Sequence, residues 1–384
     1  MNSIPEPLQQ VERTYVLRRG RKLSYFAGCD YHRLSSHPVV LRAAAEAVSK
    51  YGLNVAASRM TTGNHLLYGK LESALEDFFG AESATLASNG YQPNLMVAQA
   101  LKGNFSHALL DERAHGCLAD ASQMLDCPVI RFRHRDPSHL AQILKRLGNV
   151  SPLLLTDGVF AYNGAIAPIP DYLDLMPKAG MILIDDAHGA GVIGKSGRGS
   201  PEFHNVSRKR IIQTMTLSKA FGVYGGAVLG AKRLRQNILD KSNLFSGNTP
   251  LPLPLAHAAC ESLKLLQKKP SLLRSLRKNI DLVRSHLGLN CTLPGGNQNP
   301  IIAVICQNSW EVRKIKQILE NAQIHAPFIH YPGGPRHGYF RFALSGSHEP
   351  SQLENLIDVL KQLPEACFER DTGEVNNNEH RETP

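Results

Sequence analysis

Hydrophobic residues fall into two alternating patterns along most of the chain. Short apolar runs bounded by polar residues or glycine predict buried strands, at 84–87, 108–111, 128–132, 152–156 and 181–184. Between and beyond these runs, apolar residues at helical spacing predict helices, at 39–51, 67–78, 94–101, 115–125, 137–147, 231–243 and 255–267. The alternation predicts an α/β fold, with a mostly parallel, doubly wound sheet and helices on both of its faces.

The pattern changes after about residue 270. Helices are predicted at 272–287, 309–321 and 350–363, with strand-like segments at 301–305 and 339–344. These segments suggest a second, smaller α/β domain. We therefore divide the chain into four parts: a basic N-terminal arm (1–38), a large domain (39–255), a small C-terminal domain (256–367) and an Asn/Glu-rich tail expected to be disordered (368–384).

Composition narrows the class of protein. Of the 384 residues, 42% are hydrophobic and 20% charged, as in soluble globular enzymes. The seven cysteines show no Cys-x-x-Cys spacing, which argues against disulfides and a zinc site and predicts a cytoplasmic location. No secretory signal or membrane-spanning apolar run is present, so we expect no membrane association. The net charge of +10 suits an anionic substrate such as a coenzyme A thioester, and no nucleic-acid-binding motif accompanies it.

One lysine stands out among the candidate catalytic residues. Lys219 lies among small and hydroxylated residues, and a desolvated lysine amine readily forms a Schiff base with an aldehyde. Taken alone, a solvated loop lysine explains Lys219 better. Upstream, however, the predicted strand 181–184 ends in Asp185 and Asp186, with His188 close behind. Ligands of open α/β sheets bind at such strand ends, and an aspartate there can keep a pyridinium nitrogen protonated.

Two glycine-containing segments could bind an anion. The turn 88–94 joins a strand to a helix start, where backbone N–H groups and the helix dipole favour phosphate, although a simple capped connection is equally common. The segment 189–196 matches both the P-loop and the dinucleotide-binding patterns. Those patterns need glycines directly after a strand and a helix directly after the glycines, whereas Gly-Arg-Gly-Ser-Pro follows here. We favour a close-packed loop and keep a P-loop nucleotide-binding protein as an alternative from another class.

The lysine segment, the Asp-Asp-Ala-His sequence and the Gly90-Tyr91 pair together resemble the α-oxoamine synthase family of fold-type I pyridoxal-phosphate enzymes, over about residues 25–360. The resemblance implies pyridoxal 5'-phosphate as cofactor. It implies that Lys219 carries the cofactor, that Asp185 pairs with the pyridine nitrogen, that His188 lies near the phenolic oxygen and that His115 stacks over the ring.

The resemblance also implies substrates and further contacts. Family members join an amino acid to an acyl thioester, of coenzyme A or of acyl carrier protein, with decarboxylation. Gly90, Tyr91 and Thr216 would contact the cofactor phosphate, and Arg341 would bind the amino-acid carboxylate. Family members are homodimers, so Ser246 and Thr249 are expected to reach the phosphate of the neighbouring subunit. No metal is expected. A relative that binds the cofactor but has lost transferase activity remains an alternative.

Several positions depart from the family pattern. Cys29 stands where an asparagine near the substrate carboxylate is usual, and Ala161 stands where a serine near the cofactor is usual. Tyr68 replaces a common histidine, and Tyr339 falls on the first position of an Arg-x-Arg pair. The residues that the family uses to bind the cofactor are nearly all present, whereas several of those that contact the substrate are replaced. The resemblance therefore implies the chemistry more firmly than the amino acid.

Overall fold

A seven-stranded sheet lies at the centre of the computed structural model, which describes residues 4–289, 298–330 and 335–368. Its strands are, in spatial order, β4 (Ser83–Ala87), β10 (Gly226–Gly230), β9 (Ile211–Thr216), β8 (Met181–Asp185), β7 (Pro152–Asp157), β5 (His107–Asp111) and β6 (Val129–Phe132). β10 runs antiparallel to both of its neighbours, and the other neighbouring pairs are parallel. The predicted mostly parallel sheet is confirmed.

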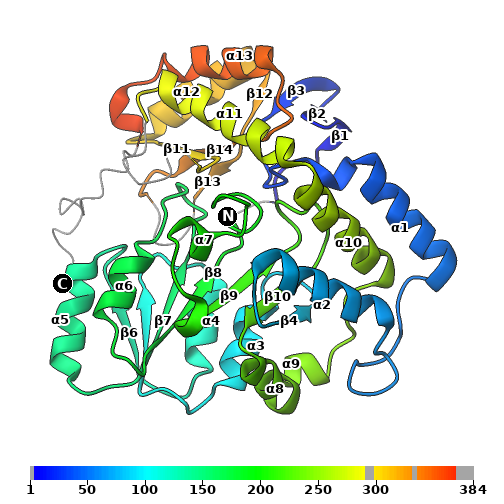
Figure 1. Ribbon diagram of the computed structural model, residues 1–384. Helices are drawn as coiled ribbons and strands as arrows, with labels where there is room; N and C mark the ends of the chain where they lie inside the picture. Colours follow the sequence, from blue (N-terminus) through cyan, green and yellow to red (C-terminus); the bar gives the residue numbers. More distant parts are fainter. Residues whose placement is uncertain (1–3, 290–297, 331–334, 369–384) are drawn as a thin grey trace.

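Helices cover both faces of this sheet (Figure 1). One face packs against α3 (Gln92–Ala100), α4 (Gly116–Gln123) and α8 (Lys232–Lys241), and the other against α5 (Pro137–Leu147) and α6 (Ile169–Leu175). Alternate residues of β8 serve the two cores: Leu183 lies in the first, and Ile182 and Ile184 in the second. A strand buried on both faces needs a continuous run of apolar residues, and that run is what predicts this strand from the sequence.

A third group of helices packs beside the β4 edge. It consists of α1 (Pro38–Tyr51), α2 (Leu66–Phe79) and α10 (Leu253–Lys268), and α10 contacts both of the others. The remaining short helical segments of residues 4–289 are α7 (Ser200–Phe203), α9 (Asn243–Ser246), and the 3-10 turns η1 (Leu34–Ser36) and η2 (Arg208–Arg210).

The C-terminal elements form a separate layer above the large sheet (Figure 1). An antiparallel sheet in the order β11 (Ile301–Ile305), β14 (Tyr339–Ala343) and β13 (Phe328–Ile329) is accompanied by α11 (Pro270–His286), α12 (Ser309–Asn321), α13 (Pro350–Leu360) and the 3-10 turn η3 (Glu365–Cys367). The domain boundaries remain predictions. The expected disorder concerns residues 368–384, of which all but Phe368 lie outside the described residues.

The N-terminal segment contains three strands that the hydrophobic pattern does not predict. β1 (Gln9–Glu12), β2 (Tyr15–Arg18) and β3 (Arg21–Tyr25) form an antiparallel meander, and β3 pairs in parallel with β12 (Ile324–His325). β1 is exposed throughout, so backbone pairing rather than an apolar face defines it. The expected arm is thus joined to the C-terminal part of the chain.

Two general expectations can be compared with the described residues. Six of the seven cysteines lie there and all six are free, while Cys291 lies outside. No helix within the described ranges is long and apolar enough to cross a bilayer.

Candidate active site

The carboxyl ends of adjacent parallel strands bring the candidate residues together. Asp185, at the end of β8, is paired in register with Asp157 of β7 and with Thr214 of β9. Lys219 lies in the connection between β9 and β10. One pocket of about 180 Å³ is lined by Gly90, Tyr91, His115, Cys117, Asp157, Asp185, Ala187, His188, Thr216 and Lys219. Seven of the ten predicted site residues therefore share a pocket: Gly90, Tyr91, His115, Asp185, His188, Thr216 and Lys219.

A hydrogen-bond network fixes the Asp185 carboxylate. Asn94 Nδ2 donates to Asp185 Oδ2 over 2.7 Å, and the backbone N–H of Ala187 donates to Oδ1 over 3.0 Å. Thr214 Oγ1 donates to Asn94 Oδ1 over 2.7 Å, so the amide group of Asn94 is oriented with its NH₂ toward the aspartate. Asn94 and Thr214 are buried. The sequence pattern does not identify Asn94 or Thr214 as partners of Asp185. Only the pairing of β8 with β9 and the packing of α3 bring these side chains next to the aspartate.

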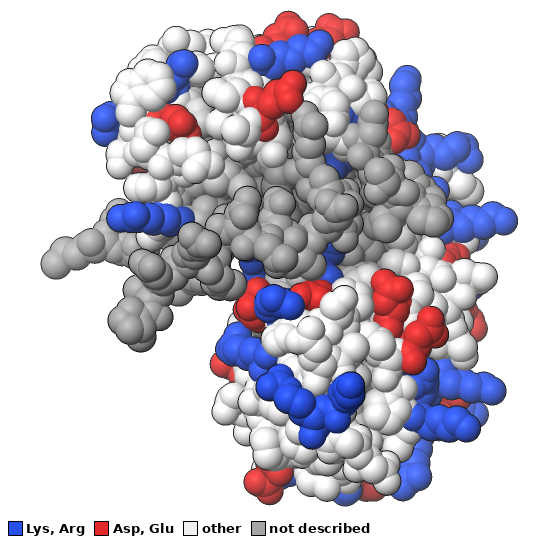
Figure 2. Space-filling view, turned by 90° about the vertical axis from the view of Figure 1, so that its left-hand side faces the viewer, with Lys and Arg blue, Asp and Glu red and all other residues white. Residues whose placement is uncertain are grey.

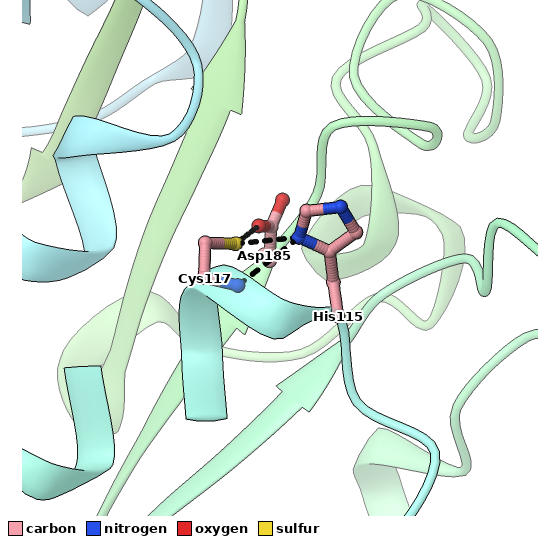
Figure 3. Close-up of side chains that lie close together, drawn as sticks. All are labelled: His115, Cys117 and Asp185. Atoms are coloured by element: carbon pink, nitrogen blue, oxygen red, sulfur yellow. Dashed lines mark hydrogen bonds between the residues drawn. The ribbon is translucent and has the colours of Figure 1, made fainter. Parts of the chain in front are cut away.

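Cys117 gives Asp185 another donor. Its thiol donates to Asp185 Oδ2 over 3.0 Å and lies 2.9 Å from His115 Nδ1 (Figure 3). Imidazole, thiol and carboxylate groups this close together are the ligand types of a zinc site. Burial, followed by the negative charge of Asp185, raises the pKa of Cys117 well above its usual range, so the sulfur is a neutral donor here. The absence of a resident metal remains a prediction.

Lys219 contacts a buried histidine. Its Nζ lies 2.9 Å from His188 Nε2, and His188 Nδ1 lies 2.7 Å from the hydroxyl of Tyr31. Burial lowers the pKa of His188 well below its usual value, and the positive charges of Lys219 and Arg341 lower it further. The imidazole is therefore neutral. Tyr31 is fully buried, and it was not among the predicted site residues although it lies only two residues after Cys29.

Asp157 is a second carboxyl group in the pocket. It accepts a hydrogen bond from the backbone N–H of His115 over 2.8 Å. Burial and then the charge of Asp185 raise the pKa of Asp157 well above its usual value. Asp157 therefore holds a proton more readily than an exposed aspartate does. Asp157 was not among the predicted site residues, although its position at the end of a predicted strand could have indicated it.

The Gly90 turn approaches the Thr216 side chain closely. A Cβ atom on Gly90 would lie 2.5 Å from Thr216 Oγ1, so the turn requires glycine. Thr216 Oγ1 accepts from the backbone N–H of Ser218 and donates to the carbonyl of Gly225, both over 3.1 Å. The Tyr91 ring meets the His115 ring edge-on, with 6.1 Å between centroids. The predicted phosphate contacts of these residues remain predictions.

Three predicted residues lie outside the pocket lining. Arg341, on β14, donates from Nη1 to the carbonyl of Ala161 over 3.2 Å, and its Nη2 lies 3.9 Å from Cys29 Sγ. Arg341 thus lies between two positions that depart from the family pattern. Ser246 and Thr249 accept hydrogen bonds at their carbonyl oxygens, from the hydroxyls of Ser58 and Ser88, and their expected contact with a partner subunit remains a prediction.

The glycine-rich segment 189–199 surrounds a buried carboxylate. Asp186 accepts from the Ser200 hydroxyl over 2.7 Å and from Gln213 Nε2 over 2.6 Å. Cβ atoms on Gly189 and Gly199 would lie 2.0 and 1.9 Å from its oxygens. The glycines therefore make room for Asp186, and the next helix begins only at Ser200. This geometry is a close-packed loop and lacks the strand–glycine–helix order of a P-loop.

Comparisons with known proteins agree with one another. The model of the family described as aminotransferase class I and II matches residues 26–360. A putative 8-amino-7-oxononanoate synthase of Desulforudis audaxviator (strain MP104C) is 32% identical over 364 residues, covering 94% of both chains. The 8-amino-7-oxononanoate synthase of Beijerinckia indica is 34% identical, covering 90% of this chain and 89% of its own. The solved serine palmitoyltransferase of Sphingomonas wittichii superposes with a TM-score of 0.85 at 26% identity, covering 94% and 92% of the two chains.

Proposed function

This chain belongs to the aminotransferase class I and II family and, within it, to the pyridoxal-phosphate-dependent α-oxoamine synthases, and we propose that it is an 8-amino-7-oxononanoate synthase of biotin synthesis. The proposed reaction joins alanine to a pimeloyl thioester, with loss of carbon dioxide. The names of the relatives support this choice. Glycine C-acetyltransferase is the alternative within the family, since Cys29 and Ala161 leave the amino-acid side of the site unlike the usual pattern.

The pocket residues fit pyridoxal phosphate. An amine and a fixed carboxylate face the same pocket, from Lys219 and Asp185, and Gly90 and Thr216 line it at the start of α3. When bound, the cofactor withdraws electrons from the α-carbon of the amino acid. We propose that Lys219 holds the cofactor and, once released, takes the α-proton at Nζ. Asp185 would keep the pyridine nitrogen protonated, and its orientation would be set by Asn94 and Cys117.

His188 and Arg341 would position the substrate. His188 is buried and neutral, so its Nε2 can donate to or accept from a neighbouring oxygen or nitrogen without adding charge to the pocket. Arg341 offers a planar guanidinium suited to a carboxylate. Its position next to the pocket is the observation that carries the amino-acid assignment. Its positive charge lowers the pKa of His188, and its guanidinium contacts Ala161 and Cys29.

A substrate panel tests the proposal. Purified protein loaded with pyridoxal phosphate is incubated with alanine, glycine or serine, each with pimeloyl-CoA or acetyl-CoA, and release of carbon dioxide and of free thiol is measured. We expect alanine with pimeloyl-CoA to give the largest kcat/KM. Turnover only with glycine and acetyl-CoA would favour the alternative. An absorbance band that borohydride removes, without turnover of any pair, would identify a cofactor-binding relative that has lost transferase activity.

The net positive charge of the chain is compatible with an anionic acyl donor. Basic and acidic side chains are interspersed on the face shown in Figure 2, so the net charge of +10 is not gathered into one surface there. We propose an acyl thioester, of coenzyme A or of acyl carrier protein, as the anionic partner and no nucleic acid. Comparing pimeloyl-CoA with a pimeloyl thioester of acyl carrier protein in the same assay distinguishes the two donors.

We also propose a cytoplasmic homodimer whose sites lie at the interface. Exposed apolar side chains gather in one stretch of the chain, at Leu41, Val48, Leu53, Met60 and Leu66. This stretch includes Ser58, whose hydroxyl donates to the backbone carbonyl of Ser246. Light scattering measures the mass. If Ser246 and Thr249 act across the interface, mixing Lys219→Ala protein with a Ser246→Ala/Thr249→Ala variant restores activity, whereas sites complete within one subunit give no restoration.

A further inference from the structure

We propose that His115, Cys117 and Asp185 bind Zn²⁺ when pyridoxal phosphate is absent, and that zinc and the cofactor exclude one another. The zinc site rests on the contacts of the three side chains alone. The mutual exclusion rests on the proposed function, because it takes Asp185 as the partner of the pyridine nitrogen. The expectation of no resident metal in the cofactor-loaded protein is unchanged.

Three types of zinc ligand converge in the pocket. Among the residues that the structure describes, a ring nitrogen of His115, the sulfur of Cys117 and a carboxylate oxygen of Asp185 lie within 4.8 Å of one another (Figure 3). Cys117 Sγ lies 2.9 Å from His115 Nδ1 and 3.0 Å from Asp185 Oδ2. The ligand atoms of a tetrahedral zinc ion lie about 3.5 Å apart, given bonds of about 2.0–2.3 Å. Small side-chain movements therefore suffice to admit the ion.

A single thiol proton lies between two acceptors. His115 Nδ1 accepts the backbone N–H of Cys117 over 3.3 Å, so this nitrogen carries a lone pair, as a metal ligand must. The second acceptor is the Asp185 carboxylate. The S–H of Cys117 can point at only one of them at a time. A zinc ion in place of this proton bonds sulfur, nitrogen and oxygen together, and the displaced proton passes to water.

The charges of the ligands suit a divalent cation. Burial and the charge of Asp185 raise the pKa of the free Cys117 thiol, but a thiol that coordinates a metal ion is deprotonated. Thiolate and carboxylate then balance the two positive charges of zinc. Asn94 Nδ2 supports both ligands, since it lies 3.1 Å from Cys117 Sγ and 2.7 Å from Asp185 Oδ2. Hydrogen-bond donors of this kind orient metal ligands.

The ligand atoms also determine which metal binds. Sulfur and nitrogen donors suit zinc, whereas magnesium and calcium take oxygen ligands. The three residues line the pocket of about 180 Å³, so the fourth position of a tetrahedral ion is open to water. The proposed cofactor position needs the Asp185 carboxylate for the pyridine nitrogen and places the ring over His115. Zinc and cofactor would therefore compete for the same two side chains.

Cobalt makes the site visible, because Co²⁺ accepts the same ligands and absorbs light. The full-length, cofactor-free protein is titrated with Co²⁺, which is then displaced by Zn²⁺. We expect a sulfur-to-cobalt charge-transfer band that zinc removes. Cys117→Ser should lose this band and bind zinc more than about 100-fold more weakly, since loss of a residue that only supports a ligand already costs about 10- to 100-fold. Cys127→Ser is the matched control, because Cys127 is half-buried outside the pocket lining, and it should keep the band.

The second measurement is cofactor binding at a fixed concentration of free zinc. In wild type and in Cys127→Ser, the apparent cofactor Kd should rise about tenfold when free zinc is about nine times its own Kd. In Cys117→Ser, the same zinc concentration should leave the cofactor Kd unchanged. Unfolding midpoints are recorded for each variant. If Cys117→Ser is unstable, Asp185→Asn gives an independent test, because a neutral amide is a poorer zinc ligand and should weaken cobalt binding about tenfold or more.

The outcomes separate the zinc site from the proposed function. No charge-transfer band in wild type, an equal band in Cys117→Ser, or unchanged cobalt affinity in Asp185→Asn overturns the zinc site and leaves the proposed function intact. A wild-type band together with a cofactor Kd that zinc does not alter overturns the mutual exclusion, and with it the assignment of Asp185 to the pyridine nitrogen.

Discussion

Removing the amide that orients Asp185 should weaken cofactor binding more than it weakens the fold. In Asn94→Ala, the carboxylate loses a donor at 2.7 Å, and the Thr214 hydroxyl loses its acceptor on Asn94. Asp185 keeps its bonds from Cys117 and from the N–H of Ala187.

The size of the effect follows from the kind of bond lost. A hydrogen bond to a charged group contributes about 1.5–3 kcal/mol, which corresponds to roughly 10- to 150-fold in an equilibrium constant. Thr214→Val removes a hydroxyl that contacts the Asn94 side-chain carbonyl and the Ile184 backbone carbonyl and none of the donors to Asp185. A neutral bond is worth about 0.5–1.5 kcal/mol, so we expect a loss of about 2- to 12-fold in cofactor affinity. The clearest expectation is therefore the order: Asn94→Ala should lose more cofactor affinity than Thr214→Val.

The assay is titration of cofactor-free protein with pyridoxal phosphate, followed by absorbance, with urea unfolding measured in parallel. Asn308→Ala is a matched control, since Asn308 caps α12 through the N–H of Glu311 and lies outside the pocket. It should cost about 1 kcal/mol of stability and leave the cofactor Kd unchanged. If Asn94→Ala loses stability but binds the cofactor like wild type, the network around Asp185 is structural only.

Four further outcomes are expected. Lys219→Ala should abolish turnover and the borohydride-sensitive band, while Lys195→Ala of the glycine-rich loop keeps both; retention of the band in Lys219→Ala would refute the assignment. Asp185→Asn should retain cofactor but lose most of its kcat, because a neutral amide does not stabilise a pyridinium; near-normal turnover would make Asp185 structural. Arg341→Ala should weaken alanine binding by more than tenfold in a spectral titration, and unchanged binding would exclude it as the carboxylate ligand. Burial raises the pKa of Asp186 to about 6 from 3.8, so wild-type stability should fall relative to Asp186→Asn as pH rises from about 4 to 6, by up to about 3 kcal/mol in urea unfolding, and parallel pH profiles would contradict this.

The strands that stand out most clearly in the sequence are those buried on both faces. β7 and β8 are buried at nearly every position, so each appears as an apolar run that ends in an aspartate. β1 is exposed along its length, and β12 has only two residues, so neither leaves a hydrophobic signal. Their pairing depends on partners far away in the chain, and local composition carries no record of it.

The same distinction applies to the site. Asp185 is recognisable because it ends a strand that the hydrophobic pattern predicts. Lys219 follows β9, which that pattern does not predict, and is recognisable from the small and hydroxylated residues around it. Asn94, Cys117 and Tyr31 act through other side chains, and their contacts arise only when α3, α4 and the N-terminal turn pack around the ends of β8 and β9. Residues that orient a functional group are therefore the ones for which the structure adds most.

The amino-acid side of the site explains why the substrate is harder to infer than the cofactor. Arg341 already donates to the Ala161 carbonyl, and its other terminal nitrogen faces the Cys29 sulfur. A side chain at 161 with a hydroxyl, or an amide at 29, would offer the substrate a hydrogen bond worth about 1.5–3 kcal/mol to a charged carboxylate. This chain has neither. To hold a carboxylate with both terminal nitrogens, Arg341 must exchange the Ala161 carbonyl for the substrate, so part of the binding energy is spent on breaking an existing bond. Affinity for alanine should accordingly be low, and selectivity among small amino acids should depend on the space beside Ala161 rather than on additional polar contacts.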